Sequence, residues 1–146
     1  MKKVVYITAV VGLLLIGGEL FARFVLGLGD PPLSIADREI DYLFAPNQNC
    51  NRFGNAIIYN NYSMRTGFDI TNDGRKRIFV VGDSVVNGGA MTDHNRLATT
   101  LLQNELGDCY AVCNVSAGSW GLGNCVAYFN KNYELLAGGG GIVLRG

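Results

Sequence analysis

The stretch RIFVVGDSVVNGG, residues 77–89, decides the fold that this sequence predicts. Its apolar run, residues 78–81, leads without interruption into Gly-Asp-Ser at 82–84. A continuous apolar run of this length is typical of a strand whose two faces are both covered, as in a parallel sheet. Functional groups of such sheets gather beyond the carboxyl ends of the strands, which is where Ser84 stands. The stretch therefore predicts a parallel sheet and directs attention to Ser84.

Downstream of this strand the pattern alternates between helix and strand. Residues 94–106 predict a helix with Asp93 as its N-cap. A second strand is expected at 110–116, a second helix at 124–136 and a third strand at 142–144. The leucines of the first helix fall on one face: Leu97, Leu101, Leu102 and Leu106. Strands and helices that alternate through short connections imply an α/β fold with right-handed crossovers.

The N-terminal residues are typical of a membrane-spanning helix. Lys2 and Lys3 precede a long apolar run, and a span needs about 20 mostly apolar residues, which 4–22 supplies with a single charge. Glu19 and Arg23 lie one helical turn apart and can form an ion pair.

Three interpretations of this run compete: a retained signal anchor, a cleaved signal peptide, and a buried helix of a soluble domain. The run is not followed by a small-x-small cleavage site, which favours retention. Because positively charged flanks stay in the cytoplasm, we expect Lys2 and Lys3 inside and residues from Asp30 onward outside, in the periplasm or the extracellular space. We therefore divide the chain into an anchor at 1–29, an extracytoplasmic linker or arm at 30–76, and the N-terminal part of an α/β domain at 77–146.

Composition sets further limits. The 146 residues suffice for one modest domain, and twelve basic residues balance twelve acidic ones, so no nucleic-acid partner is expected. The chain has a single histidine and no Cys-x-x-Cys, which argues against zinc, and we expect no cofactor. In an oxidising compartment the four cysteines could pair in three complete ways, but buried thiols are the expectation for at least some of them.

The tripeptide around Ser84 has a structural and a functional interpretation. A serine that begins a helix after a strand can place its own N–H beside its hydroxyl, an arrangement that stabilises an oxyanion. Gly82 and Gly88 allow tight turns around it and leave room for a substrate. In the structural interpretation, Gly-Asp-Ser is only a turn that ends the strand, with Asp83 as a capping residue. The three residues Gly-Asp-Ser alone favour the structural interpretation.

Two longer blocks of sequence favour the functional interpretation of Ser84. Gly-Asp-Ser-x-x-x-Gly after an apolar strand resembles the first signature block of the SGNH, or GDSL-like, hydrolases. NVSAGSWGLGN, which begins at Asn114, is similar to their second block, and NNYSMRT at 60–66 is similar to an Asn/Ser/Arg element of the membrane-anchored members. The resemblance covers about residues 57–136, and the blocks follow the family's order.

The resemblance implies a three-layer α/β/α, flavodoxin-like fold and a role for each matched residue. Ser84 is the expected nucleophile, which attacks an ester carbonyl to form an acyl-enzyme. Asp83 is expected to shape the turn. The second oxyanion donor falls on Gly118, although the shifted loop leaves Ser119 or Gly121 as alternatives. Trp120 beside them lines an acyl pocket or simply packs in the core.

The family also has an oxyanion asparagine in a third block and an Asp-x-x-His near its C-terminus. Neither occurs in the 146 residues, so we expect the front part of a truncated domain without esterase turnover of its own. The one histidine, His94, comes ten residues after Ser84, and we expect it to be an exposed helix-start residue rather than the general base.

Three functions remain open from the sequence. The first is a membrane-anchored serine esterase or acyl-hydrolase that acts on O-acylated glycans outside the cytoplasm. The alternative is a non-catalytic, membrane-anchored glycan-binding or accessory protein. A Rossmann-type nucleotide binder is the weakest of the three, because the first strand is not followed by Gly-x-Gly-x-x-Gly.

Overall fold

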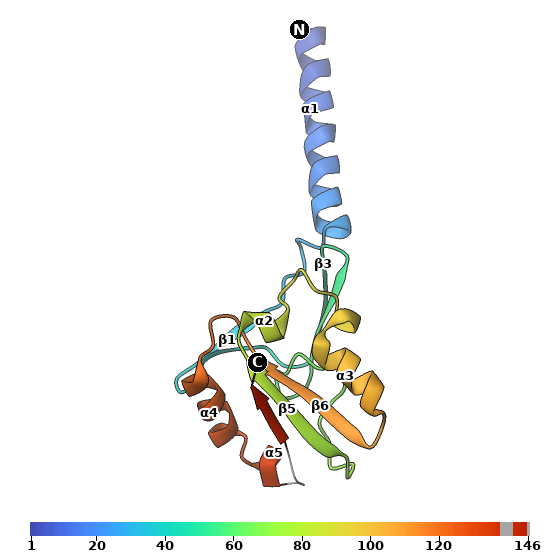
Figure 1. Ribbon diagram of the computed structural model, residues 1–146. Coiled ribbons are helices and arrows are strands. Elements are labelled where there is room, and N and C mark those ends of the chain that lie inside the picture. The colour runs from blue at the N-terminus through green and yellow to red at the C-terminus, as the bar shows by residue number, and fades with distance from the viewer. Residues whose placement is uncertain (138–141, 146) are drawn as a thin grey trace.

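The computed structural model describes residues 1–137 and 142–145 and shows a mixed α/β domain below a long N-terminal helix (Figure 1). A small parallel sheet lies at its centre. It consists of β5 (Lys76–Gly82), β6 (Tyr110–Ser116) and β7 (Ile142–Arg145) in the order β6-β5-β7. These strands and their parallel pairing confirm the α/β prediction.

The helices after β5 differ in detail from the prediction. The segment expected to be one helix at 124–136 is two, α4 (Leu122–Lys131) and α5 (Glu134–Ala137), because the chain leaves helical geometry at Asn132, where φ is −117° and ψ is 43°. The carboxyl end of β5 leads into the short helix α2 (Ser84–Asn87).

The helix expected at 94–106 is also divided. Asp93 does cap its start, but what it caps is a single 3₁₀ turn, His94–Arg96. Leu97 then adopts extended backbone angles, and α3 (Ala98–Leu106) begins after it. The predicted leucine face is consequently wrong: Leu97 is buried, whereas Leu101 and Leu106 are 52% and 36% exposed.

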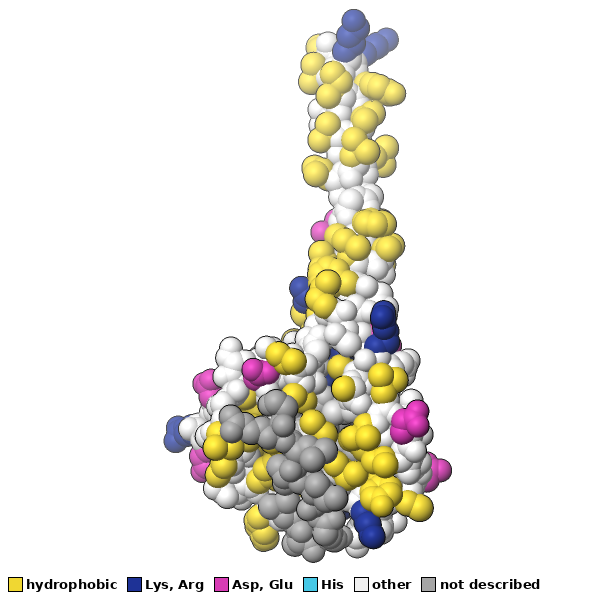
Figure 2. All heavy atoms as spheres, viewed as in Figure 1, with side chains coloured by type: hydrophobic (Ala, Val, Ile, Leu, Met, Phe, Trp, Pro, Cys, Tyr) yellow, Lys and Arg dark blue, Asp and Glu magenta, His cyan; other side chains and the backbone are white. Residues whose placement is uncertain are grey.

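The N-terminal helix projects away from the domain. Its α-helical part, α1, runs over Lys2–Leu20, and a π-helical turn at Phe21–Val25 continues it. Together they form a helix of 24 residues that contains an 18-residue window with a mean hydropathy of 2.2, so it is long and apolar enough to cross a membrane. None of its residues is buried in the domain, and Figure 2 shows hydrophobic side chains along its length. This exposure excludes the buried-helix interpretation. Arg23 pairs with Glu19 at 2.8 Å, as the sequence predicted.

Residues 30–76, expected to be a linker or arm, form two antiparallel hairpins. The first joins β1 (Ser34–Asp37) to β2 (Asp41–Phe44), and the second joins β3 (Gln48–Arg52) to β4 (Asn55–Tyr59). Apolar side chains from this segment enter the same core as the sheet and α4. The main members of that core are Ile40, Leu43, Met64, Ile70, Phe79, Val81, Cys113, Val115 and Tyr128.

The second hairpin holds the end of the long helix. The Phe53 N–H donates to the Leu26 carbonyl at 2.8 Å, and the Asn51 N–H donates to the Asp30 carboxylate at 3.4 Å. Gly27 has a φ of +66°, and a Cβ there would lie 2.0 Å from the Asn51 carbonyl oxygen. The helix therefore ends directly against the tip of the β3–β4 hairpin.

Candidate functional site

Ser84 begins α2 directly after β5, at the strand-to-helix position that the sequence predicted. Its side chain is exposed, and none of the described residues hydrogen-bonds to its hydroxyl. Asp83 precedes it as the N-cap, since its Oδ1 accepts from the Val85 N–H at 2.8 Å. The capping role proposed for Asp83 is therefore present. It fixes the turn on which the Ser84 hydroxyl is presented.

Two glycines shape the backbone around Ser84. Gly82 ends β5 opposite Ser116 of β6, so the first and second sequence blocks meet at the carboxyl edge of the sheet. Gly88 ends α2 with φ +73° and donates its N–H to the Ser84 carbonyl at 3.0 Å. A Cβ at Gly88 would lie 2.6 Å from a methyl of Leu97, so both the conformation and the space require glycine there.

The loop after β6 begins at this edge of the sheet, and two of its backbone N–H groups lack a described partner. The Tyr42 hydroxyl donates to the Gly118 carbonyl at 2.7 Å and fixes that peptide, while no described residue accepts from the N–H of Gly118 or of Ser119. The Gly121 N–H, in contrast, donates to Asn124 Oδ1 at 2.8 Å. Of the three donors considered from the sequence, Gly118 and Ser119 are the two whose N–H groups stay available to a substrate.

Trp120 packs in the core and also forms a wall beside Ser84's turn. It is 7% exposed, and its indole N–H donates to the Tyr42 carbonyl at 3.1 Å. Its ring lines a small pocket of about 90 Å³ together with Asp83 and Leu122. The packing interpretation of Trp120 is confirmed, and its role in an acyl pocket stays a prediction.

A buried polar network beneath α2 was not anticipated from the sequence. The Asn87 side chain is 2% exposed and donates from Nδ2 to the Ser116 carbonyl at 2.9 Å. Its Oδ1 accepts from the Tyr59 hydroxyl at 3.2 Å. Burial raises the pKa of Tyr59 to about 12, so this hydroxyl stays protonated as a donor. The network connects α2 to the sheet and to the β3–β4 hairpin.

Asn114 in β6 extends the same network. This side chain is fully buried and donates from Nδ2 to the Val86 carbonyl at 2.9 Å and to the Thr99 hydroxyl at 3.1 Å. The Ser116 hydroxyl donates to its Oδ1. A polar residue in an otherwise apolar strand is the signal that could have indicated this role, because buried polar groups need partners.

Arg65 braces the loop that follows α2. It is fully buried, donates from Nη2 to the Thr92 carbonyl at 3.1 Å, and stacks 5.5 Å from the Tyr59 ring centre. Its N–H also donates to the Asn114 carbonyl at 3.0 Å. Burial lowers the pKa of the guanidinium. The NNYSMRT segment therefore acts as a support behind the candidate site, not as a part of its exposed surface.

His94 lines a pocket to which Ser84 does not contribute. It is 8% exposed, so the expectation of an exposed residue was wrong, and it lines a separate pocket of about 200 Å³ with Arg65 and Phe68. Burial lowers its pKa, and no described residue bonds its Nδ1. Ser84 is not among the residues that line this pocket.

Two other features of the described residues bear on chemistry. No three metal-ligating side chains come together among them. Cys109 is an exposed free thiol, Cys50 and Cys113 are buried free thiols, and Cys125 is buried. Comparison of the chain with known proteins found no matching family model, curated protein or solved structure.

Proposed function

We propose that this chain carries the nucleophile and the first oxyanion donors of an SGNH-like serine ester hydrolase. The observation that carries the proposal is the pairing of Gly82 with Ser116, which brings the Ser84 turn and the Gly118 loop to one edge of the sheet. The sheet order β6-β5-β7 is compatible with the centre of a three-layer, flavodoxin-like fold.

The chemistry follows from these positions. Ser84 Oγ attacks the carbonyl carbon of an ester, and the carbonyl oxygen becomes an oxyanion between the N–H groups of Ser84 and Gly118. Collapse of this intermediate releases the alcohol and leaves an acyl group on Ser84. Water then attacks the acyl-enzyme, releases the acid and returns the proton to Ser84.

The attack requires a base that accepts the Oγ proton. No described residue hydrogen-bonds to the Ser84 hydroxyl, and the sequence contains no second histidine. In the family that the chain resembles, the histidine of an Asp-x-x-His element accepts this proton. Serine without such a base is a poor nucleophile, so Ser84 of the 146-residue chain should react slowly with esters.

A membrane location is part of this proposal, and the length and apolar composition of the N-terminal helix support it. With Lys2 and Lys3 on the cytoplasmic side, α1 acts as a signal anchor and the domain lies outside the cytoplasm. The ester substrates are then extracytoplasmic, and O-acylated glycans are the class we propose.

The test is covalent labelling of Ser84 in the 146-residue chain. A fluorophosphonate reacts with activated serines, and imidazole added to the solution supplies the missing base. We expect imidazole to accelerate labelling of the parent protein and of Ser119→Gly, which removes an exposed hydroxyl from the same edge and suits that residue's φ of +61°. Ser84→Ala should not be labelled.

Equal labelling of Ser84→Ala and the parent would refute the assignment. If no variant is labelled while the chain is retained on an immobilised acetylated glycan, the non-catalytic binding function is the correct one.

A further inference from the structure

The candidate site is connected to the end of the long helix by a short series of contacts. After α2, the Ala90 carbonyl accepts from the Asn55 side chain at 3.0 Å, and the Ala56 N–H donates to Asp93 at 2.8 Å. Asn55 and Ala56 adjoin the tip of the β3–β4 hairpin, and Phe53 at that tip bonds Leu26 at 2.8 Å. The loop that follows Ser84 is therefore held at the level where α1 meets the domain.

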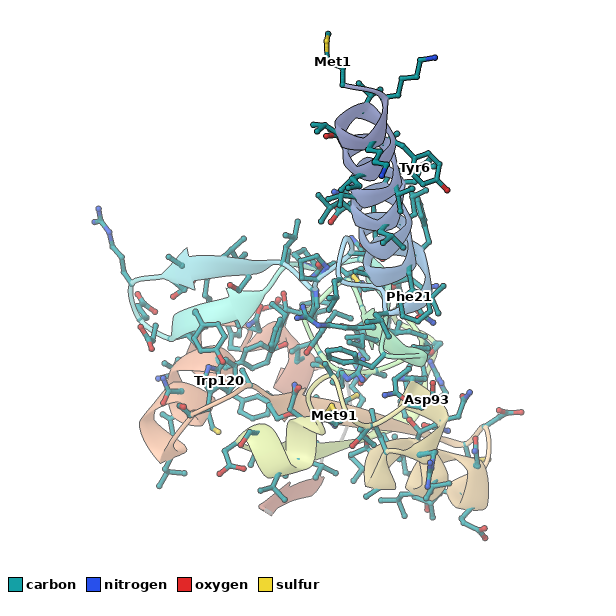
Figure 3. All side chains as sticks on the ribbon, turned by 90° about the horizontal axis from the view of Figure 1, so that it is seen from above. Met1, Tyr6, Phe21, Met91, Asp93 and Trp120 are labelled. Carbon is teal, nitrogen blue, oxygen red and sulfur yellow. The ribbon has the colours of Figure 1, made fainter. Side chains whose placement is uncertain are left out.

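The orientation of the sheet agrees with these contacts. In Figure 1 the arrowheads of β5, β6 and β7 point toward α2, on the side of the domain from which α1 rises, and α5 lies at the opposite end. Figure 3 views the domain from above, the side of α1, and Met91 lies between α2 and the base of that helix in this view. The carboxyl edge of the sheet thus faces the same side as the membrane-spanning segment.

Large apolar side chains are exposed around this edge. Val85, directly after the nucleophile, is 85% exposed, Met91 in the loop after α2 is 78% exposed, and Leu122 at the start of α4 is 57% exposed. They come from three different segments, and Leu122 borders the pocket that Asp83 and Trp120 line. Large exposed apolar side chains on the segments that carry a candidate site are expected of a surface that contacts an apolar partner.

We propose that the site opens toward the membrane surface and takes an ester carried by a molecule embedded in the leaflet, a lipid or a lipid-linked glycan. The inference rests on the proposed function and narrows its substrate class. The bilayer is the occupant that the structure favours, because α1 ends against the same hairpin that holds the site's loop. Val85, Met91 and Leu122 then contact acyl chains or the headgroup boundary, and the ester of an embedded molecule reaches Ser84 without leaving the leaflet.

The first test measures how deeply individual side chains lie in the bilayer, and it does not depend on the reactivity of Ser84. The chain is reconstituted into phosphatidylcholine vesicles that contain phospholipids brominated near the headgroup. Tryptophan is introduced by Met91→Trp, by Val85→Trp and, as a control at the far end, by Tyr133→Trp, which replaces a side chain that is 71% exposed. We expect loss of the added emission for the first two variants and no loss for Tyr133→Trp.

The second test measures substrate preference. With imidazole present, Ser84 is labelled either by a long-alkyl fluorophosphonate dissolved in the vesicles or by a short water-soluble one. Met91→Glu should lower labelling by the embedded probe by about tenfold and leave labelling by the soluble probe unchanged. Leu101→Glu, which changes an exposed leucine on α3, should leave both unchanged.

The outcomes separate the two proposals. A chain that does not float with the vesicles overturns both the anchor and this inference. If the chain floats but neither Met91→Trp nor Val85→Trp is quenched, the inference is wrong and the esterase proposal stands. If quenching occurs but Ser84 is not labelled by either probe, the site faces the membrane and the nucleophile assignment is wrong.

Discussion

The side-chain amide of Asn87 donates a 2.9 Å hydrogen bond to the backbone carbonyl of Ser116. This bond joins the helix that begins with Ser84 to the strand that leads into the Gly118 loop. The two halves of the candidate oxyanion site are thus connected through a buried amide as well as through the pairing of β5 with β6. Disturbing either connection should move the nucleophile relative to its donors.

We expect Asn87→Ala to lower the free energy of unfolding by about 1–3 kcal/mol, because it leaves the Ser116 carbonyl and the Tyr59 hydroxyl without this partner. It should also slow imidazole-dependent labelling of Ser84. Urea denaturation and the labelling rate are the measurements. Asn95→Ala is the control, since Asn95 is exposed. Equal stability of the two variants would contradict the role assigned to Asn87.

Gly88→Ala and Gly89→Ala form a matched pair. Both glycines have positive φ, +73° and +54°, so both substitutions carry conformational strain of about 1–2 kcal/mol. Only at Gly88 does the new methyl meet a neighbour, Leu97, at 2.6 Å. Gly88→Ala should therefore be less stable than Gly89→Ala by a further ~1–3 kcal/mol in urea denaturation. Similar free energies of unfolding for the two variants would show that the residues around Gly88 move to accommodate the new methyl group.

Buried His94 predicts a pH dependence of stability. Burial, with a contribution from Arg65, lowers its pKa below the ordinary 6.5, while Asp93 opposes the shift. The unfolded chain then binds a proton at a higher pH than the folded one does. Stability should be at its full value above about pH 6.5 and fall as the pH decreases toward the folded-state pKa. Urea denaturation between pH 7 and pH 5 checks this against His94→Asn, whose profile should be flatter.

The topology predicts the fate of a reporter fused after Gly146. With Lys2 and Lys3 inside, alkaline phosphatase at that position should be active and should remain in the membrane fraction. An active but soluble and shortened product would show that the apolar helix is a cleaved signal peptide. An inactive fusion would place the domain in the cytoplasm.

The parent protein should hydrolyse p-nitrophenyl acetate no faster than the Ser84→Ala variant when no base is added. General-base assistance typically contributes about 10²–10⁴-fold, and His94 lies in a pocket that Ser84 does not line. The assay needs purified, monodisperse protein. Ser84-dependent turnover at ordinary enzyme rates would mean that a base has been overlooked.

Several elements were predictable because their signals are local. The apolar run at 78–81 indicated β5, the polar break at 82–84 indicated its end, and the spacing of Glu19 and Arg23 indicated their ion pair. Backbone geometry and side-chain periodicity depend on near neighbours. Such patterns therefore indicated the three strands of the parallel sheet, the long helix and the position of Ser84.

The helix after Asp93 shows where local patterns fail. Four leucines indicated one buried face, yet the extended backbone at Leu97 turns that residue into the core and leaves Leu101 and Leu106 exposed. A continuous helix was the simplest pattern for these residues. The loop held by Arg65 and the hairpin imposed a different entry direction.

What the sequence by itself determined is the three strands of the parallel sheet, the apolar helix at the N-terminus, and the serine at the end of β5. Only the tertiary structure decided that Arg65, Asn87, His94 and Asn114 are buried behind that serine. The physical reason is that a polar side chain becomes buried only where distant segments supply its hydrogen-bond partners or enclose it. Asn87 needs Ser116 and Tyr59, which lie 29 and 28 residues away along the chain, and no local pattern encodes their meeting.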